Sequence, residues 1–130
     1  MHRVLAVDDS PAIRRLVEVS LSELDVEVEE AGSGQSTKNA LVAHPPDVML
    51  LDLGLPDMSG WEVIDFVVET PALDGLEIIV LSGYGDATDQ DRAMEAGVAG
   101  YLVKPFRPAD LRRMVRDALR PDFENEPLGA

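Results

Sequence analysis

Short apolar runs along the chain predict buried strands, because a strand covered on both faces has no polar side. The first run is Val4–Val7, and "VMLLDL" and "LEIIVLS" follow at 48–53 and 76–82. "GYLVKP" at 100–105 predicts a further strand. The segment "DVEVEEA" at 25–31 alternates apolar with acidic residues, which indicates a shorter strand near a sheet edge. The pattern therefore predicts five strands.

Between these runs, apolar residues recur at helical spacing. A weaker helix is predicted at about Ser36–Ala43, ended by two prolines. The helix predicted at about Asp86–Ala96 has few large apolar residues, Met94 being the main one, which predicts weak anchoring and local mobility. The other three helices carry clear apolar stripes: Ile13, Leu16, Val17, Leu21 and Leu24; Gly60, Val63, Ile64, Val67 and Val68; and Leu111, Met114, Val115, Ala118 and Leu119.

Each predicted strand is followed by a helix, and this alternation defines the fold class. Strands that are apolar throughout and joined by helices form a parallel sheet covered on both faces. With right-handed crossovers the fold is doubly wound α/β. The pattern predicts one domain over residues 1–120, and "PDFENEPLGA" at 121–130 is acidic, breaks the pattern and is predicted to be a flexible tail or the start of a linker.

Composition narrows the range of partners. The chain of 130 residues is 45% hydrophobic and has a net charge of −14, which argues against binding nucleic acid or anionic membranes. It has no cysteine, and therefore no disulfide, thiolate metal site or thiol nucleophile. It lacks both an apolar run of membrane-spanning length and the apolar core of a signal peptide. A cytoplasmic location is the default expectation.

The first strand runs into two adjacent aspartates in "VLAVDDS". Acids often cap helices, but Ser10 followed by Pro11 already supplies a strong helix start. Asp8 and Asp9 are therefore left without a capping role, and they repel each other unless a cation lies nearby.

Polar residues also close the other strands of the predicted sheet. Asp52 ends the third strand, Ser82 the fourth, and Lys104 the fifth. Ligands of open parallel sheets bind at the carboxyl ends of the strands, so these groups are expected to gather at one edge. Each alone could be an ordinary strand-end residue, but that interpretation weakens when several strands end in complementary groups.

The chemistry that such a cluster supports is narrow. Clustered carboxylates need a cation, and hard oxygen ligands with room for water suit Mg²⁺. A divalent ion and a lysine together clamp a phosphoryl group, and a carboxylate inside that clamp can be the nucleophile that forms an aspartyl phosphate. Asp52 is the natural nucleophile, as the lone acid on the central strand.

With these residues the chain resembles the receiver domain of bacterial two-component response regulators. The motifs are "VDDS", "VMLLDLGLPDMSGWEV", "VLSGYGD" and "AGYLVKPF", in the family's order, and the resemblance covers about Arg3 to Leu119. It implies a five-stranded, flavodoxin-like (βα)5 fold with strand order 2-1-3-4-5. It also implies a signalling switch that accepts phosphate, and not an enzyme that acts on an external metabolite.

The resemblance implies roles for the acidic edge. Asp52 would accept phosphate from a sensor histidine kinase or a histidine phosphotransfer protein. Asp9, Asp52 and the backbone carbonyl of Gly54 would ligate Mg²⁺, for which Mn²⁺ could substitute, and Asp8 would act through the metal's water. Lys104 would bind a phosphoryl oxygen and pair with Asp52 before phosphorylation.

The resemblance also implies a switch. Ser82 would move toward the phosphate, and Tyr101 would turn inward as it does so. Gly83 is small enough to leave room for the phosphodonor, and the Lys104–Pro105 bond is typically cis in the family. The rearrangement would control an output partner through the surface of the fourth helix, the fifth strand and the fifth helix.

Two positions depart from the common pattern. Gly54 and Tyr84 stand where the family tunes the lifetime of the phosphate, and the sign of their combined effect stays open. "GVAGYL" at 97–102 lacks the acidic pair often seen in receivers that dimerise through the fourth and fifth helices, so a phosphorylation-dependent dimer of that kind is in doubt.

Two other functions remain as alternatives. A Mg²⁺-dependent phosphohydrolase with an aspartate nucleophile usually has a second acid two residues later, where this chain has Gly54. A pseudo-receiver that only binds partners would have no need of a phosphorylation site, which here comprises Asp8, Asp9, Asp52, Ser82 and Lys104. The chain is either a stand-alone receiver of the chemotaxis type or a piece of a larger regulator or hybrid kinase.

Overall fold

A computed structural model describes residues 1–83 and 87–119 of the chain. The strands are β1 (His2–Val7), β2 (Val26–Ala31), β3 (Val48–Asp52), β4 (Glu77–Ser82) and β5 (Gly100–Val103). The helices are α1 (Pro11–Ser20), α2 (Gly34–Ala43), α3 (Gly60–Val68), α4 (Ala87–Glu95) and α5 (Pro108–Ala118), with a 3₁₀ helix η1 (Pro71–Leu73) before β4. Within the described residues, five parallel strands form one sheet in the order β2-β1-β3-β4-β5, as predicted.

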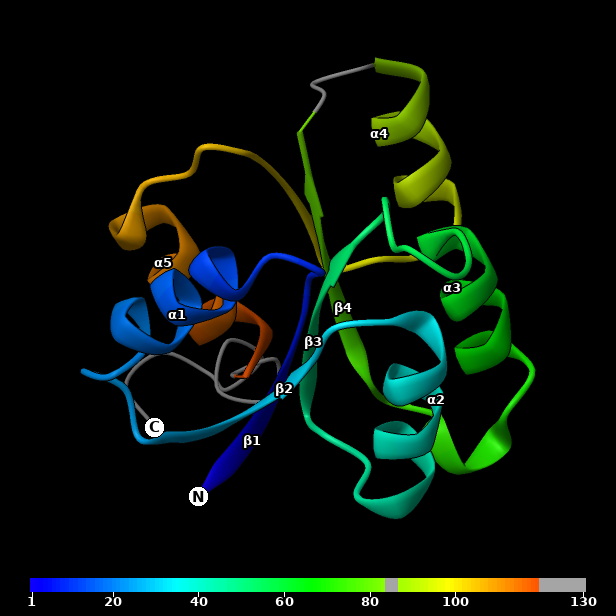
Figure 1. Ribbon diagram of the computed structural model, residues 1–130, viewed down its shortest axis with the longest axis horizontal. Helices are drawn as coiled ribbons and strands as arrows, with labels where there is room; N and C mark the ends of the chain where they lie inside the picture. The colour runs from blue at the N-terminus through cyan, green and yellow to red at the C-terminus, as the bar shows by residue number, and fades with distance from the viewer. Residues whose placement is uncertain (84–86, 120–130) are drawn as a thin grey trace, which may run out of the picture.

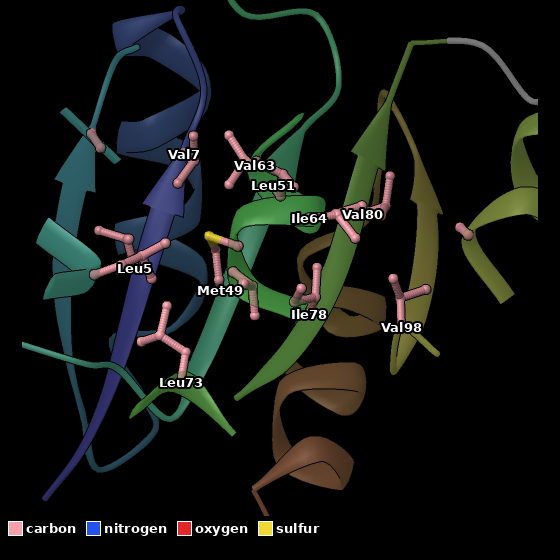
Figure 2. Close-up of a cluster of buried hydrophobic side chains, with 14 residues drawn as sticks. Leu5, Val7, Met49, Leu51, Val63, Ile64, Leu73, Ile78, Val80 and Val98 are labelled. Carbon is pink, nitrogen blue, oxygen red and sulfur yellow. The ribbon is translucent and has the colours of Figure 1, made fainter. Parts of the chain in front are cut away.

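The sheet separates two hydrophobic cores. Helices α1 and α5 cover one face and α2, α3 and α4 the other (Figure 1). Along β1, Leu5 and Val7 point to the second face, which we call the α2–α4 core, and Val4 and Ala6 point to the first, the α1–α5 core. Figure 2 shows the α2–α4 core, in which side chains of β1, β3 and β4 meet those of α3. Because β1, β3 and β4 are buried on both faces over most of their length, they read as continuous apolar runs. The edge strands β2 and β5 are only partly buried.

Helix starts follow the local sequence. The hydroxyl of Ser10 accepts a hydrogen bond from the N–H of Ile13 at 3.3 Å, so Ser10 caps α1 as predicted. Helix α2 begins two residues before its predicted start, because Ser33 and Ser36 form a reciprocal capping box. The pattern did not predict η1, a single turn that leads into β4.

Helix α4 exists where the pattern predicts a weak helix, but its contact with the sheet differs from the expected one. Met94 is 61% exposed, and Ala93 is the buried residue of α4 over its described span, 87–95. The predicted start at Asp86 and the predicted tail at 121–130 lie outside the described residues.

Candidate functional site

The parallel register brings the carboxyl ends of four strands to one edge. Val7 pairs with Leu51, Asp52 with Leu81, and Ser82 with Val103. The residues that end or follow β1, β3, β4 and β5 therefore lie side by side, as predicted.

Three carboxylates gather at this edge. Asp8, Asp9 and Asp52 each offer an oxygen, and these atoms lie within 4.8 Å of one another. Asp8 and Asp52 are buried, with 2% and 7% of their surface exposed, whereas Asp9 is exposed. Two buried carboxylates and one open to solvent form a cluster that a cation can reach from outside.

Lys104 provides a positive charge inside the cluster. Its Nζ lies 2.6 Å from Oδ2 of Asp8 and 3.5 Å from Oδ1 of Asp52. The expected pairing with Asp52 is thus present, but the shorter contact is to Asp8. The other oxygen of Asp8 accepts from the N–H of Ser10 at 2.9 Å. Both oxygens of Asp8 are therefore engaged within the protein, which leaves Asp9 and Asp52 as the acids better placed to meet a metal directly.

The site perturbs the protonation of two groups. Burial raises the pKa of Asp52, and the negative charge of Asp8 raises it further, against the lowering effect of the Gly54 N–H and of Lys104. Burial alone would lower the pKa of Lys104, but its hydrogen bond to Asp8 and the charge of Asp52 outweigh burial and raise it. The lysine is held protonated, while the carboxylate of Asp52 is destabilised until a further cation arrives.

The two predicted switch residues, Ser82 and Tyr101, differ in burial. Ser82 is buried at the end of β4, and its carbonyl accepts from the N–H of Lys104 at 2.6 Å. Gly83 has open space where a side chain would project. Tyr101 is half-buried and packs against the α2–α4 core. The Lys104–Pro105 peptide is cis, as the resemblance implies.

The loop after β3 lies directly against the nucleophile candidate. The N–H of Gly54 donates to Oδ1 of Asp52 at 3.1 Å. A Cβ on Gly60 would lie 2.7 Å from the Cα of Leu53, so only glycine allows α3 to start this close to the end of β3. Tyr84, predicted to affect phosphate lifetime, lies outside the described residues.

Two arginines make side-chain contacts that were not predicted. Arg14 donates from Nη1 to the carbonyl of Asp8 at 2.6 Å and from Nε to Glu30 at 3.0 Å, and so supports the acidic turn. The guanidinium of Arg92 in α4 lies 4.1 Å from the ring centroid of Trp61 in α3. The contacts of Arg14 with Glu30 and of Arg92 with Trp61 join different elements, and no local spacing rule indicates them.

The donor set fits a hard divalent cation. Carboxylate oxygens close together, with one of them exposed, suit Mg²⁺, which keeps several waters and takes one or two carboxylates. The residues present therefore match the predicted metal.

Comparison with known proteins identifies the family. Residues 4–116 match the family model of the response regulator receiver domain, so the chain belongs to this family of two-component signalling domains. This membership confirms the predicted family and fold class and the predicted signalling role.

Individual relatives agree with this assignment. The chain is 38% identical over 126 residues to the transcriptional regulatory protein KdpE of Mycobacterium tuberculosis, covering 92% of this chain and 52% of that protein. It is 34% identical to the DNA-binding response regulator MtrA of Mycolicibacterium smegmatis, covering 97% of this chain and 54% of MtrA. The chain thus spans about half the length of these curated relatives.

Solved structures show the same fold. A putative response regulator from Chloroflexus aurantiacus superposes with a TM-score of 0.85 at 31% identity, covering 91% of this chain and 97% of that one. The chemotaxis response regulator CheY4 of Vibrio cholerae gives a TM-score of 0.83 at 30% identity, covering 91% of this chain and 98% of that one.

Within the described part of the chain, no helix has the length and apolar character that a membrane span requires.

Proposed function

We propose that Asp52 is the phosphoacceptor of this receiver domain. The observation that carries the proposal is the arrangement of charge around it: Asp8 and Asp9 within 4.8 Å, and Lys104 Nζ at 3.5 Å. A carboxylate oxygen of Asp52 would attack the phosphorus of a phosphohistidine. The bond between phosphorus and nitrogen would break, and the imidazole would leave with the electron pair.

The surrounding residues have separate tasks in this proposal. Asp9, Asp52 and the carbonyl of Gly54 would hold Mg²⁺, or Mn²⁺ in its place. Asp8 would act through the metal's water, because both its oxygens are already engaged. The ion supplies Lewis-acid stabilisation of the negative charge that grows on the phosphoryl oxygens. Lys104 binds a phosphoryl oxygen once it leaves Asp52.

Phosphorylation then acts as a switch. It adds negative charge and acceptor oxygens at the sheet edge, where the hydroxyl of Ser82, buried at the end of β4, would donate to them. Movement of Ser82 frees space that Tyr101 can enter from β5. Gly54 brings no side chain to orient water, and Gly54 and Tyr84 are the two positions proposed to tune the lifetime of the phosphate. The domain catalyses its own phosphorylation and dephosphorylation and turns over no external substrate.

The partners follow from the same proposal. A sensor histidine kinase or a histidine phosphotransfer protein would supply the phosphoryl group, and an output module would respond to it. The relatives that are twice as long are named as transcriptional and DNA-binding regulators, which supports an output of that class. In this proposal residues 1–120 form the receiver, and 121–130 are a flexible acidic tail or the start of a linker. A phosphorylation-dependent dimer and a cytoplasmic location stay predictions.

The test is the intact mass of the protein after incubation with acetyl phosphate, with and without Mg²⁺. We expect the gain of one phosphoryl group in the wild type with Mg²⁺, and no gain in Asp52→Asn. A gain that survives in Asp52→Asn would mean that another residue is the nucleophile. A wild type that binds Mg²⁺ but gains no mass from acetyl phosphate or from a kinase would favour a binding-only domain.

A further inference from the structure

The loop between β3 and α3 is fastened to a neighbouring helix by a residue with no assigned role. One carboxylate oxygen of Asp57 accepts from the N–H of Gly34 at 2.7 Å, and the other accepts from the N–H of Gln35 at 3.0 Å. Both amides belong to the first turn of α2, more than twenty residues earlier in the chain. These two hydrogen bonds lower the pKa of Asp57, so the carboxylate is charged at neutral pH.

An apolar contact fastens the same loop beside this carboxylate. Met58 follows Asp57 and packs on the α2–α4 core. Its side chain fills the space next to Gly34, because a Cβ on that glycine would lie 2.2 Å from Cγ of Met58. The loop is therefore held on α2 by a bidentate carboxylate and a close-packed methionine.

Helix α2 has its own cap, independent of this loop. The hydroxyl of Ser33 accepts from the N–H of Ser36 at 3.1 Å, and the N–H of Ser33 donates back to the Ser36 hydroxyl at 3.1 Å. Helix α2 therefore does not need Asp57 as a cap. The hydrogen bonds of Asp57 instead tie the loop between β3 and α3 to the start of α2. This difference allows capping and positioning to be separated by experiment.

The other part of the loop reaches the acidic cluster. The N–H of Gly54 donates to Asp52, and Gly54 also forms a β-bridge with Ser59, the residue after Met58. The N–H of Gly60 donates to the carbonyl of Leu53 at 2.9 Å, which closes the loop. Any shift of the segment at 57–58 is therefore passed to Gly54 through a short closed loop.

We propose that Asp57 is a positioning residue for the metal site: by clamping the loop to α2, it fixes the backbone of Gly54 so that its carbonyl can bind the cation held by Asp9 and Asp52. The inference rests on the proposed function, because it presumes that Gly54 is a metal ligand. Asp57 itself does not touch the ion.

Calorimetric titration with MgCl₂ tests this proposal on the whole chain. We expect Asp57→Ala to weaken Mg²⁺ binding about tenfold, the lower end of what supporting residues contribute in metal sites. Asp57→Asn keeps one acceptor oxygen and should lie between the wild type and Asp57→Ala. The control is Ser33→Ala, which removes a cap from the same helix without touching the loop. It should lower the midpoint of thermal unfolding and leave Mg²⁺ affinity unchanged.

Each outcome decides something. Wild-type affinity in a folded Asp57→Ala protein would overturn the positioning role, and so would an equal loss in Ser33→Ala, since the effect would then pass through α2 stability. A wild type that takes up neither Mg²⁺ nor phosphate would instead overturn the proposed function. If Asp57→Ala fails to fold, Gly34→Ala takes its place in the test. The added methyl on α2 would displace Met58, move the clamped loop and so weaken Mg²⁺ binding. Unchanged Mg²⁺ affinity in Gly34→Ala would contradict the proposal.

Discussion

Helices α4 and α5 flank the last strands of the sheet, but very different contacts hold them there. Helix α5 buries Leu111 and Val115 completely in the α1–α5 core. Helix α4 buries Ala93, and its exposed Arg92 stacks on Trp61. Burying a Leu or Val side chain contributes roughly 1.5–3 kcal/mol, whereas an alanine methyl contributes less than about 1 kcal/mol. The comparison teaches that α5 belongs to the scaffold, whereas α4 can be displaced at small cost.

This difference connects packing to the proposed switch. A ligand or phosphoryl group can shift an equilibrium only by its differential interaction with the two states. A helix whose buried residue, over its described span 87–95, is a single alanine needs a small differential interaction to move. We therefore expect α4 to respond to chemistry at Asp52, and α5 to stay in place.

The largest effect is expected when a buried side chain of α5 is shortened. Leu111→Ala should lower the free energy of unfolding by about 2–5 kcal/mol, because it leaves a cavity in a fully buried position. Urea denaturation measures this loss. A loss below about 1 kcal/mol, against the stated range for such truncations, would show that α5 is anchored no better than α4.

The next effect concerns the negative charge of Asp52, the site of the chemistry to which α4 would respond. Because burial raises the pKa of Asp52 above its usual 3.8, its carboxylate lowers the stability of the folded state once the pH exceeds that value. Asp52→Asn should therefore be more stable than the wild type at neutral pH without Mg²⁺. The difference should shrink as the pH falls through the raised pKa toward 3.8. Urea denaturation of both proteins across this window checks the sign, and a variant less stable than the wild type at pH 7 would contradict it.

A smaller effect is expected at the contact between α3 and α4. Arg92→Ala removes the guanidinium that lies over Trp61 and should cost about 0.5–1 kcal/mol, the usual range for an exposed cation–π pair. Trp61 is the sole tryptophan of the chain, so its fluorescence should change at the same time. Arg113→Ala is the matched control, because this arginine of α5 pairs with Asp110 in its own helix. An unchanged tryptophan spectrum in Arg92→Ala would remove this contact from the account.

The smallest effect is expected at Met94. This side chain is 61% exposed, so Met94→Ala should change the free energy of unfolding by no more than about 0.5 kcal/mol. A loss of unfolding free energy comparable with that of Leu111→Ala would mean that α4 is anchored through Met94. The sequence suggested this, because Met94 is the main large apolar residue of that helix.

The contrast between Met94 and Ala93 also shows how far sequence reasoning reaches. The apolar runs of β1, β3 and β4 predicted buried strands correctly, because burial on both faces leaves a simple pattern. The thin apolar content of α4 predicted a weak helix, but hydrophobicity alone selected Met94, whereas helix rotation buries Ala93. In a helix with a single buried apolar residue over its described span, the side that faces the sheet is set by its neighbours and not by its own pattern.

The site divides in a similar way. Asp8, Asp9, Asp52, Ser82 and Lys104 were predicted to meet because each closes a strand, and strand ends meet at the edge of a parallel sheet. The closer approach of Lys104 to Asp8, the support from Arg14 and the clamp by Asp57 were not predicted. These depend on side-chain reach across loops, which no spacing rule encodes.

Hydrogen exchange of α4 and α5, measured with and without phosphorylation, tests the central claim most directly. The wild type with Mg²⁺ is compared before and after acetyl phosphate, with Asp52→Asn as the control and intact mass as proof of modification. We expect amides at 87–95 to exchange faster than those at 108–118, and phosphorylation to change exchange in α4 while α5 is unaffected. Equal protection of the two helices, or a change confined to α5 in a protein that carries the phosphoryl group, would contradict the account.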